Sequence, residues 1–383
     1  MKIVADENIP LLEALYADFG ELLLLPGRKI DSLSVRDADL LLVRSVTRVD
    51  RKLLQGSSLR FVGSTTIGVD HIDTDYLASA GIGFCSAPGC NTEAVVDYIL
   101  SVMATLFRDD PASLTDKQVG IVGRGSVGGR LATRLEVLGI KTICCDPPLA
   151  HQGVVGLVAI EQLLEEADIL TLHTPLTLTG QHQTLHLLDD KRLNQLKTGA
   201  VLINTSRGAV VDNSALLRLL LKRSDIRCVL DVWENEPGIN TDLLPLLALA
   251  TPHIAGYSQE GKIRGALMVY RSVCNYFGLP VRSALGALMP APLELPLSGS
   301  GNDFDSIMDL FGCLLPLAYD VCGDDQDFRS TMQDAKIRGT VALDFDLLRK
   351  QYLQRREFGS IKPVGSQVTI QRRQLLRAAG FCC

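Results

Sequence analysis

The sequence predicts an α/β protein with two doubly wound parallel sheets and a separate C-terminal region after them. Two observations predict this fold class. Short apolar runs of strand type alternate with helical stretches up to about residue 260, and this alternation is typical of parallel sheets covered by helices. Beyond Pro280 the composition changes, because prolines at 290, 292 and 296 precede the serine–glycine run 298–301. Such a run indicates a linker into a separate C-terminal region.

The first part of the chain is expected to form one parallel-sheet domain. Its strand-type runs are residues 3–5, 22–25, 40–43, 61–63 and 83–85. A helix over 91–107 is apolar on more than one side, which indicates burial. A second long helix over 259–276 is expected to bring the chain back to this domain. We therefore predict domains over 1–90 with 259–285, over 91–258 and over 286–383.

The second domain opens with a strand, a glycine turn and a helix start in succession. The strand ends at Val122, and Gly123, Gly125 and Gly128 follow with the spacing G-x-G-x-x-G. In a dinucleotide-binding turn the first glycine permits the tight turn, the second lets the backbone approach a pyrophosphate, and the third lets the helix pack closely. Asp146 ends the next strand, where a carboxylate binds the ribose hydroxyls and repels a 2′-phosphate. The turn therefore predicts a Rossmann-like domain that binds NAD rather than NADP.

Three polar stretches follow later strands of this domain, and they contain Arg207, Glu236 and His253. The strands after the glycine turn are expected near 141–145, 168–172, 200–204, 227–231 and 249–251. Because the carboxyl ends of parallel strands meet at one edge of a sheet, the three side chains can face a common point. A guanidinium can bind a carboxylate with two hydrogen bonds, and an imidazole supported by an acid can remove a hydroxyl proton. The trio predicts oxidation of a 2-hydroxy acid, with hydride passing to nicotinamide.

Each member of the trio also has a structural interpretation. Arg207 alone could be a surface ion-pair partner, and His253 alone could be a satisfied histidine at a strand end. Their order along the chain, and their position after the glycine turn, favour catalysis.

These segments resemble the D-isomer-specific 2-hydroxyacid dehydrogenase family over about residues 40–280. The matching positions are Gly123 to Gly128, Asp146, His173-Thr-Pro, Asn204 to Gly208, Asp231 to Pro237 and Thr251 to Gly256. The resemblance implies two Rossmann-like domains, the first of them discontinuous, and a C-terminal α+β dimerisation domain that forms a homodimer. It also implies that NAD is the cofactor.

The same resemblance assigns roles to individual residues. It makes Arg207, Glu236 and His253 catalytic. It implies substrate contacts by Ser45, Thr66 and Tyr257. It implies NAD contacts by the three glycines of the turn and by six further residues: Ser126, Val127, Asp146, Thr174, Asp231 and Gly256.

The amino-acid sequences of further segments resemble one branch of the family, whose substrate is a phosphorylated hydroxy acid. The segments are 43–47, 66–71, 86–91, 253–258 and, in the tail, 352–357. A phosphorylated substrate needs an anion site, which Arg44 with Ser45, or Arg28 with Lys29, could provide. For Arg28 and Lys29, exposure in a loop is an equally good interpretation.

Two other functions stay open at this point. One is a relative that acts on another hydroxy acid, such as 3-phosphoglycerate. The other is an NAD(H)-sensing protein similar to the corepressors that share this fold. The lack of a basic DNA-binding element counts against the second.

The overall composition and net charge of the chain argue against some classes of binding partner. The chain has 383 residues, a net charge of −6 and 21% charged residues, which argues against nucleic acid or an anionic membrane as a partner. The charged N-terminus and the lack of a long apolar run lead us to expect a cytoplasmic protein without membrane contact. Neither the ten cysteines nor the histidines outside the trio show metal-ligand spacing, so no metal is predicted.

The tail is less informative. Helical runs are expected near 304–322 and 343–354. Two basic segments, 349–356 and 372–377, are interpreted as a solvated face or a dimer contact. The final pair, Cys382 and Cys383, is interpreted as an exposed oxidation liability.

Overall fold

A computed structural model describes residues 1–282, 285–296, 306–353, 355–364 and 369–382. The expected linker at 298–301 and Cys383 lie outside these residues. The chain divides into two compact units, each described by itself below. Unit 1 is Met1–Asn91 with Ser258–Ala291, and unit 2 is Thr92–Tyr257 with Pro292–Cys383. The division into three domains stays a prediction.

Unit 1 contains a five-stranded parallel sheet with the order β2-β1-β3-β4-β5. Its strands are β1 (Lys2–Asp6), β2 (Glu21–Leu25), β3 (Leu40–Val43), β4 (Phe61–Ser64) and β5 (Gly83–Cys85). All five expected runs are therefore strands. The helices of this unit are α1 (Leu12–Tyr16), α2 (Arg51–Leu54), α3 (Thr74–Ser79) and α10 (Gln259–Phe277).

Helix α10 belongs to unit 1 although it follows the whole NAD-binding sequence. The Ser258 hydroxyl accepts a hydrogen bond from the Gly261 N–H and caps its start, and Gly278 ends it in the left-handed region at φ 67°. Buried α10 side chains such as Val269 and Tyr270 share one core with the first strands. The returning helix was expected from the sequence, and it completes the core of the unit.

Unit 2 contains a six-stranded parallel sheet with the order β11-β10-β9-β8-β6-β7. Its strands are β6 (Gln118–Val122), β7 (Lys141–Cys145), β8 (Ile169–Leu172), β9 (Val201–Asn204), β10 (Arg227–Leu230) and β11 (Leu249–Ala250). Each lies within one residue of the range that the sequence predicts. The order reverses beside β6, so the carboxyl ends of β6 and β8 flank the switch point at which open α/β sheets bind ligands.

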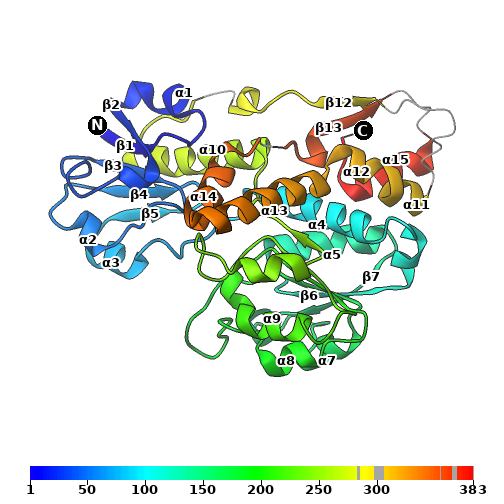
Figure 1. The fold of residues 1–383 in the computed structure, drawn as a ribbon. Coiled ribbons are helices and arrows are strands. Elements are labelled where there is room, and N and C mark those ends of the chain that lie inside the picture. Colours follow the sequence, from blue (N-terminus) through cyan, green and yellow to red (C-terminus); the bar gives the residue numbers. More distant parts are fainter. Residues whose placement is uncertain (283–284, 297–305, 354, 365–368, 383) are drawn as a thin grey trace. The chain divides into compact units, whose positions relative to one another are not determined.

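Alternate strand residues of unit 2 face two separate cores. Val119 and Ile121 belong to one core with α4 (Thr92–Leu106) and α5 (Ser126–Val137). Val122 belongs to the other core with α7 (Ile160–Glu166) and α9 (Asn213–Leu220). Figure 1 shows these helices on opposite faces of the sheet. Unit 2 also contains α6 (Pro147–His151) and α8 (Asp190–Asn194). Helices on both faces make this a doubly wound sheet, as predicted.

The C-terminal region of unit 2 is α+β. Its strands β12 (Leu293–Pro296) and β13 (Ile361–Val364) form a two-stranded parallel sheet. Its helices are α11 (Ile307–Asp309), a π-helical turn (Leu310–Leu314), α12 (Leu315–Ala318), α13 (Val321–Arg338), α14 (Val341–Gln351) and α15 (Ile370–Ala379). The sequence did not predict α13, because few of its positions are apolar and buried. None of the described helices is long and apolar enough to cross a membrane.

Helix α13 packs on the edge of the NAD-binding sheet within unit 2. The Asp325 carboxylate accepts a hydrogen bond of 2.7 Å from the N–H of Ala250 in β11. The Arg329 guanidinium donates to the carbonyls of Leu244, in the 3₁₀ helix Thr241–Leu246, and of Leu247, which follows that helix. The C-terminal region thus fixes the last strand of the sheet.

Candidate active site

The three predicted catalytic residues follow three neighbouring strands. Arg207 follows β9, Glu236 lies in the loop after β10, and His253 follows β11. The buried Asn204 side chain shapes the first of these turns: it donates to the carbonyl of Arg207 at 3.0 Å. A Cβ on Gly208 would lie 1.9 Å from the carbonyl carbon of Trp233. Glycine at this position therefore lets the turn that carries Arg207 pack directly on the turn that leads to Glu236.

Glu236 and His253 form a hydrogen-bonded pair. His253 Nδ1 and Glu236 Oε2 are 2.7 Å apart, and Glu236 Oε1 accepts from the N–H of Trp233 at 2.8 Å. Burial alone would raise the pKa of Glu236, but His253, Arg349 and the Trp233 N–H outweigh burial and lower it below its usual value. The carboxylate is therefore ionised at neutral pH and sets the direction of the imidazole.

The loop after β11 is anchored by Asp231. Its carboxylate is 1% exposed and accepts from the N–H groups of Ile254 at 2.7 Å and Ala255 at 3.0 Å. Its own carbonyl accepts from the N–H of His253 at 2.7 Å, and His253 sits in the left-handed region at φ 59°. Burial raises the pKa of Asp231 against the opposing effects of His253 and these donors. Both carboxylate oxygens have partners in this loop, and a contact of Asp231 with NAD stays a prediction.

The glycine turn has the geometry that a dinucleotide needs. Gly123 has φ 89°, and a Cβ there would lie 2.7 Å from the carbonyl oxygen of His173. A Cβ on Gly128 would lie 1.9 Å from the Gly123 oxygen, so the third glycine is required for close packing of α5. A Cβ on Gly125 would meet nothing within 4 Å, so this position borders open space. Helix α5 starts at the next residue, Ser126, and directs its free N–H groups there.

Two of the other predicted cofactor residues, Asp146 and Thr174, adjoin this turn within unit 2. Asp146 follows β7, and its carboxylate accepts from the N–H groups of Arg124 at 2.8 Å and Leu149 at 3.0 Å. The hydroxyl oxygen of Thr174 is buried and has no hydrogen-bond partner in the protein. Such an orphaned group in front of the switch point suits a polar atom of a bound cofactor. Val127 and Gly256 are half-buried.

His173 precedes Thr174 and is held neutral. Its Nε2 lies 3.0 Å from the hydroxyl of Thr171. Burial lowers the pKa of His173 to about 3. The imidazole therefore carries no charge at physiological pH.

Tyr257 has a partner that the sequence did not reveal. Nη2 of Arg349 in α14 donates to the Tyr257 hydroxyl at 3.1 Å, and the guanidinium carbon is 5.7 Å from the ring centre. Arg349 Nε is buried, so the interpretation of this basic segment as a solvated face is wrong at this residue. No local pattern identifies the contact, because the two residues are 92 positions apart.

In unit 1, Arg44 forms an ion pair with a fully buried carboxylate. Arg44 Nε and Nη2 donate to the two oxygens of Asp6 at 3.0 and 3.3 Å. Ser45, the next residue, is exposed, and so are Arg28 and Lys29. The charge of Arg44 is therefore partly balanced, and its role in phosphate binding stays a prediction.

Thr66 lies in a chain of polar groups after β4. Its hydroxyl is 2.9 Å from the hydroxyl of Ser64, which is 3.2 Å from His71 Nε2. This chain orients the Thr66 hydroxyl. Its contact with substrate stays a prediction.

One group of potential metal ligands was not visible in the sequence. His186, Asp212 and Glu234 offer ligand atoms within 4.8 Å of one another. His186 Nε2 is 2.6 Å from Glu234, and Asp212 caps α9 by accepting from the N–H of Ala215. These hydrogen bonds explain why the three side chains lie close together, and no metal ion is needed for that. The absence of a metal stays a prediction.

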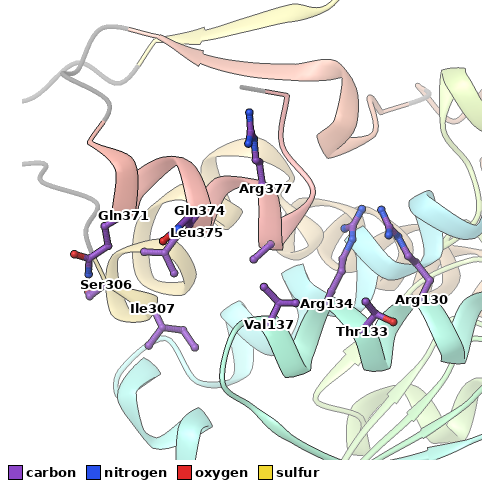
Figure 2. A pocket seen from close by; sticks show the side chains of 11 residues that line it. Arg130, Thr133, Arg134, Val137, Ser306, Ile307, Gln371, Gln374, Leu375 and Arg377 are labelled. Carbon is purple, nitrogen blue, oxygen red and sulfur yellow. The ribbon is translucent and has the colours of Figure 1, made fainter.

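A hollow of about 750 Å³ lies in unit 2. Figure 2 shows that its lining side chains come mainly from α5 and α15. Arg130 and Arg134 line it, and both pair with Glu93. None of its lining residues is a predicted site residue. It is therefore separate from the residues described above.

Comparisons with known proteins support this interpretation. Residues 104–255 match the model for the NAD binding domain of D-isomer specific 2-hydroxyacid dehydrogenases. Residues 302–380 match a domain of unknown function. NAD is therefore the cofactor, as the glycine turn and Asp146 predict.

The curated relatives agree over almost the full length. A protein of Pseudomonas putida named erythronate-4-phosphate dehydrogenase is 48% identical over 99% of both chains. A protein of the same name from Chromohalobacter salexigens is 46% identical over 100% of this chain and 98% of its own. This is the branch that segments 43–47, 66–71, 86–91 and 253–258 resemble.

Two solved structures share the fold. One is D-lactate dehydrogenase of Aquifex aeolicus with NAD and lactic acid, at 26% identity and a TM-score of 0.62, covering 72% of this chain and 96% of its own. The other is NAD-bound 3-phosphoglycerate dehydrogenase of Entamoeba histolytica, at 25% identity and a TM-score of 0.62, covering 73% and 95%. Taken with the geometry of the site, these matches show that the chain belongs to the erythronate-4-phosphate dehydrogenases, within the D-isomer specific 2-hydroxyacid dehydrogenase family.

Proposed function

We propose that this chain oxidises 4-phospho-D-erythronate to (R)-3-hydroxy-2-oxo-4-phosphooxybutanoate. The observation that carries the reaction class is the 2.7 Å hydrogen bond between Glu236 and His253 in an NAD-binding unit. The names of the near full-length relatives support the substrate. The proposal includes a role in pyridoxal phosphate (vitamin B6) biosynthesis and a cytoplasmic location.

His253 acts as the general base in this proposal. Its Nδ1 is occupied by Glu236, which leaves Nε2 to take the proton of the substrate hydroxyl. The ionised Glu236 stabilises the imidazolium that forms and keeps its ring direction fixed. A bound NAD would supply the acceptor for the hydride that leaves the same carbon.

Arg207 binds the substrate carboxylate. It follows the strand next to the one that leads to Glu236, and Gly208 keeps the two turns in contact. A guanidinium holds a carboxylate with two parallel hydrogen bonds and polarises the neighbouring oxygen. This interaction fixes the carbon that loses the hydride.

The cofactor is held by residues of unit 2. The turn of Gly123, Gly125 and Gly128, with Ser126 and Val127 at the start of α5, would bind the pyrophosphate. The remaining contacts, with the ribose and nicotinamide parts, would come from Asp146, Thr174, Asp231 and Gly256.

Four residues would contact the substrate. Ser45, Thr66 and Tyr257 offer hydroxyl groups, and Arg44 offers a cation for the phosphate. The hydrogen bonds of Thr66 and Tyr257 support the proposal, because they orient the two hydroxyls.

The test is NADH formation by the purified protein with 4-phospho-D-erythronate, 3-phosphoglycerate or D-lactate, at alkaline pH and with a scavenger for the oxo acid. A clear preference for 4-phospho-D-erythronate is the expected result. Activity on another acid alone would keep the mechanism and overturn the substrate. NADH binding without turnover of any acid would favour an NAD(H) sensor.

We also propose a homodimer that forms through residues 286–383. Several large apolar side chains of this region are at least 46% exposed. Two of them, Leu343 and Leu347, lie one turn apart on α14 and so share one face of that helix, where a partner could cover both. Sedimentation equilibrium should give twice the mass of the chain, and Leu343→Glu with Leu347→Glu should give the monomer. Val155→Glu, on an 87% exposed residue elsewhere, is the matched control.

A further inference from the structure

The loop after His253, residues 254–257, is held on one side by the buried carboxyl group of Asp231. Both oxygens of Asp231 accept hydrogen bonds from its backbone N–H groups, at Ile254 and Ala255. Asp231 lies at the end of the neighbouring strand β10. We call residues 254–257 the catalytic loop, because they continue directly from the proposed base.

A cation holds the same loop by its carbonyl groups. Arg355 Nη1 donates to the carbonyl of Ile254 at 3.1 Å and to that of Tyr257 at 3.2 Å. Arg355 Nη2 donates to the carbonyl of Ala255. Three of the four residues of the catalytic loop are therefore bound by one guanidinium, which lies about a hundred positions further along the chain.

Arg355 is itself fixed in place. Its Nη2 also donates to the carbonyl of Ala94 in α4 at 2.7 Å. The guanidinium carbon lies 4.3 Å from the ring centre of Tyr319, within the range of a cation–π interaction. A guanidinium bound to a helix, an aromatic ring and three loop carbonyls has little freedom to move.

The two side chains bind opposite groups of one short backbone segment. The Asp231 carboxyl oxygens accept from its N–H groups, and the Arg355 guanidinium donates to its C=O groups, so both side chains favour a single loop conformation. His253 precedes this segment in the left-handed region, and Tyr257 ends it. A shift of the loop would therefore turn the imidazole and displace the Tyr257 side chain.

We propose that Arg355 is a positioning residue for the oxidation: it fixes the catalytic loop and thereby the direction of His253 and Tyr257. The kinetic part of this inference rests on the function proposed above. It replaces the interpretation of this basic segment as a solvated face or dimer contact at Arg355. A lysine cannot take over the role, because its single ammonium lacks the planar fork that reaches several carbonyls and stacks on a ring.

Arg329 offers a matched control. Its guanidinium also reaches from the C-terminal region to two backbone carbonyls, those of Leu244 and Leu247. Residues 244–247 contain no proposed site residue, and a lysine at position 329 keeps a positive charge beside Asp325, the carboxylate that holds β11. Arg329→Lys and Arg355→Lys therefore remove the same kind of carbonyl interaction from the segment before β11 and from the catalytic loop.

The test compares both variants with the wild type in three measurements. They are Tm, the kcat and KM for NADH formation from 4-phospho-D-erythronate, and amide hydrogen exchange of a peptide that covers residues 250–258. We expect both variants to lose Tm to a similar extent. Only Arg355→Lys should lower kcat, by at least about tenfold, since misplacement of a catalytic group by about 1 Å costs about a hundredfold. Only Arg355→Lys should accelerate exchange in the loop, by at least about threefold.

Two results would overturn the proposal. One is an Arg355→Lys variant that keeps both kcat and loop exchange within about twofold of the wild type. The other is an equal loss of kcat in Arg329→Lys. If the wild type does not oxidise 4-phospho-D-erythronate, the proposed function fails, and hydrogen exchange still decides whether Arg355 holds the loop. If Arg355→Lys does not fold, as judged by circular dichroism, Arg355→Gln takes its place with the same outcomes.

Discussion

Replacing Gly208 by alanine tests whether contact between two strand-end turns sets the catalytic geometry. The new Cβ would lie 1.9 Å from the carbonyl carbon of Trp233, 2.0 Å from its oxygen and 2.3 Å from the N–H nitrogen of Glu234. Real Cβ atoms do not approach other atoms closer than 3.0 Å. All three contacts are with backbone, which no side-chain rotation can relieve. The turns must therefore separate by about 1 Å or more, which is enough to misplace a catalytic group.

This separation moves Arg207 relative to Glu236, because the two residues lie on the two turns. A misplacement of about 1 Å costs about a hundredfold in rate, or about 2.7 kcal/mol of transition-state stabilisation. We expect Gly208→Ala to lower kcat for 4-phospho-D-erythronate by about this factor. NADH binding, measured by fluorescence titration, should change much less, since the glycine turn at Gly123 is not affected.

Gly238→Ala is the control for this experiment. Gly238 lies in the same loop as Glu236, but its Cβ would be 3.6 Å from the carbonyl oxygen of Asn235, an ordinary contact. This variant should keep kcat within about threefold of the wild type. If Gly208→Ala also keeps its kcat, the close contact of the two turns does not position the catalytic residues, and the argument from geometry fails.

Four further variants test individual groups. His253→Ala should lose at least about a hundredfold in kcat while it still binds NADH; retained activity would assign the base to another residue. Asp146→Ser should lower the ratio of kcat/KM for NAD over NADP, and an unchanged ratio would mean that another group reads the ribose. Arg44→Ala should raise KM for a phosphorylated substrate much more than for an unphosphorylated analogue, and equal effects would remove Arg44 from the phosphate site. Burial lowers the pKa of His173 to about 3, against about 6.5 in the unfolded chain, so stability should fall as pH drops from 6.5 towards 3, by at most about 1.4 kcal/mol per pH unit. His173→Gln should flatten this decline between pH 6.5 and 5 in urea titrations, and an unchanged slope would contradict the assignment.

Elements that depend on local sequence were predictable. The strands of both sheets are short apolar runs between polar loops, and a buried parallel strand needs no other signal. Helix α13 was missed for the opposite reason, because most of its surface is polar and only a few side chains such as Phe328 and Met332 are buried. Its position depends on contacts with β11 that no local pattern shows.

The same distinction applies to the site. Arg207, Glu236 and His253 could be identified because each follows a strand, and the topology of a parallel sheet brings strand ends together. Arg349 and Arg355 could not be identified. Their partners lie about a hundred positions earlier in the chain, and a basic run near the C-terminus does not indicate which carbonyl or hydroxyl each arginine will meet.

The return of α10 to unit 1 has a consequence for synthesis on the ribosome. Residues 1–91 lack the apolar side of α10, with Val269 and Tyr270, until residues 258–291 have been made. At about 5–20 residues per second, the intervening residues 92–257 take about 10–30 s. During that time the first sheet exposes the apolar side chains that α10 later covers. Residues 1–91 are therefore expected to depend on chaperones until residues 258–291 have been synthesised.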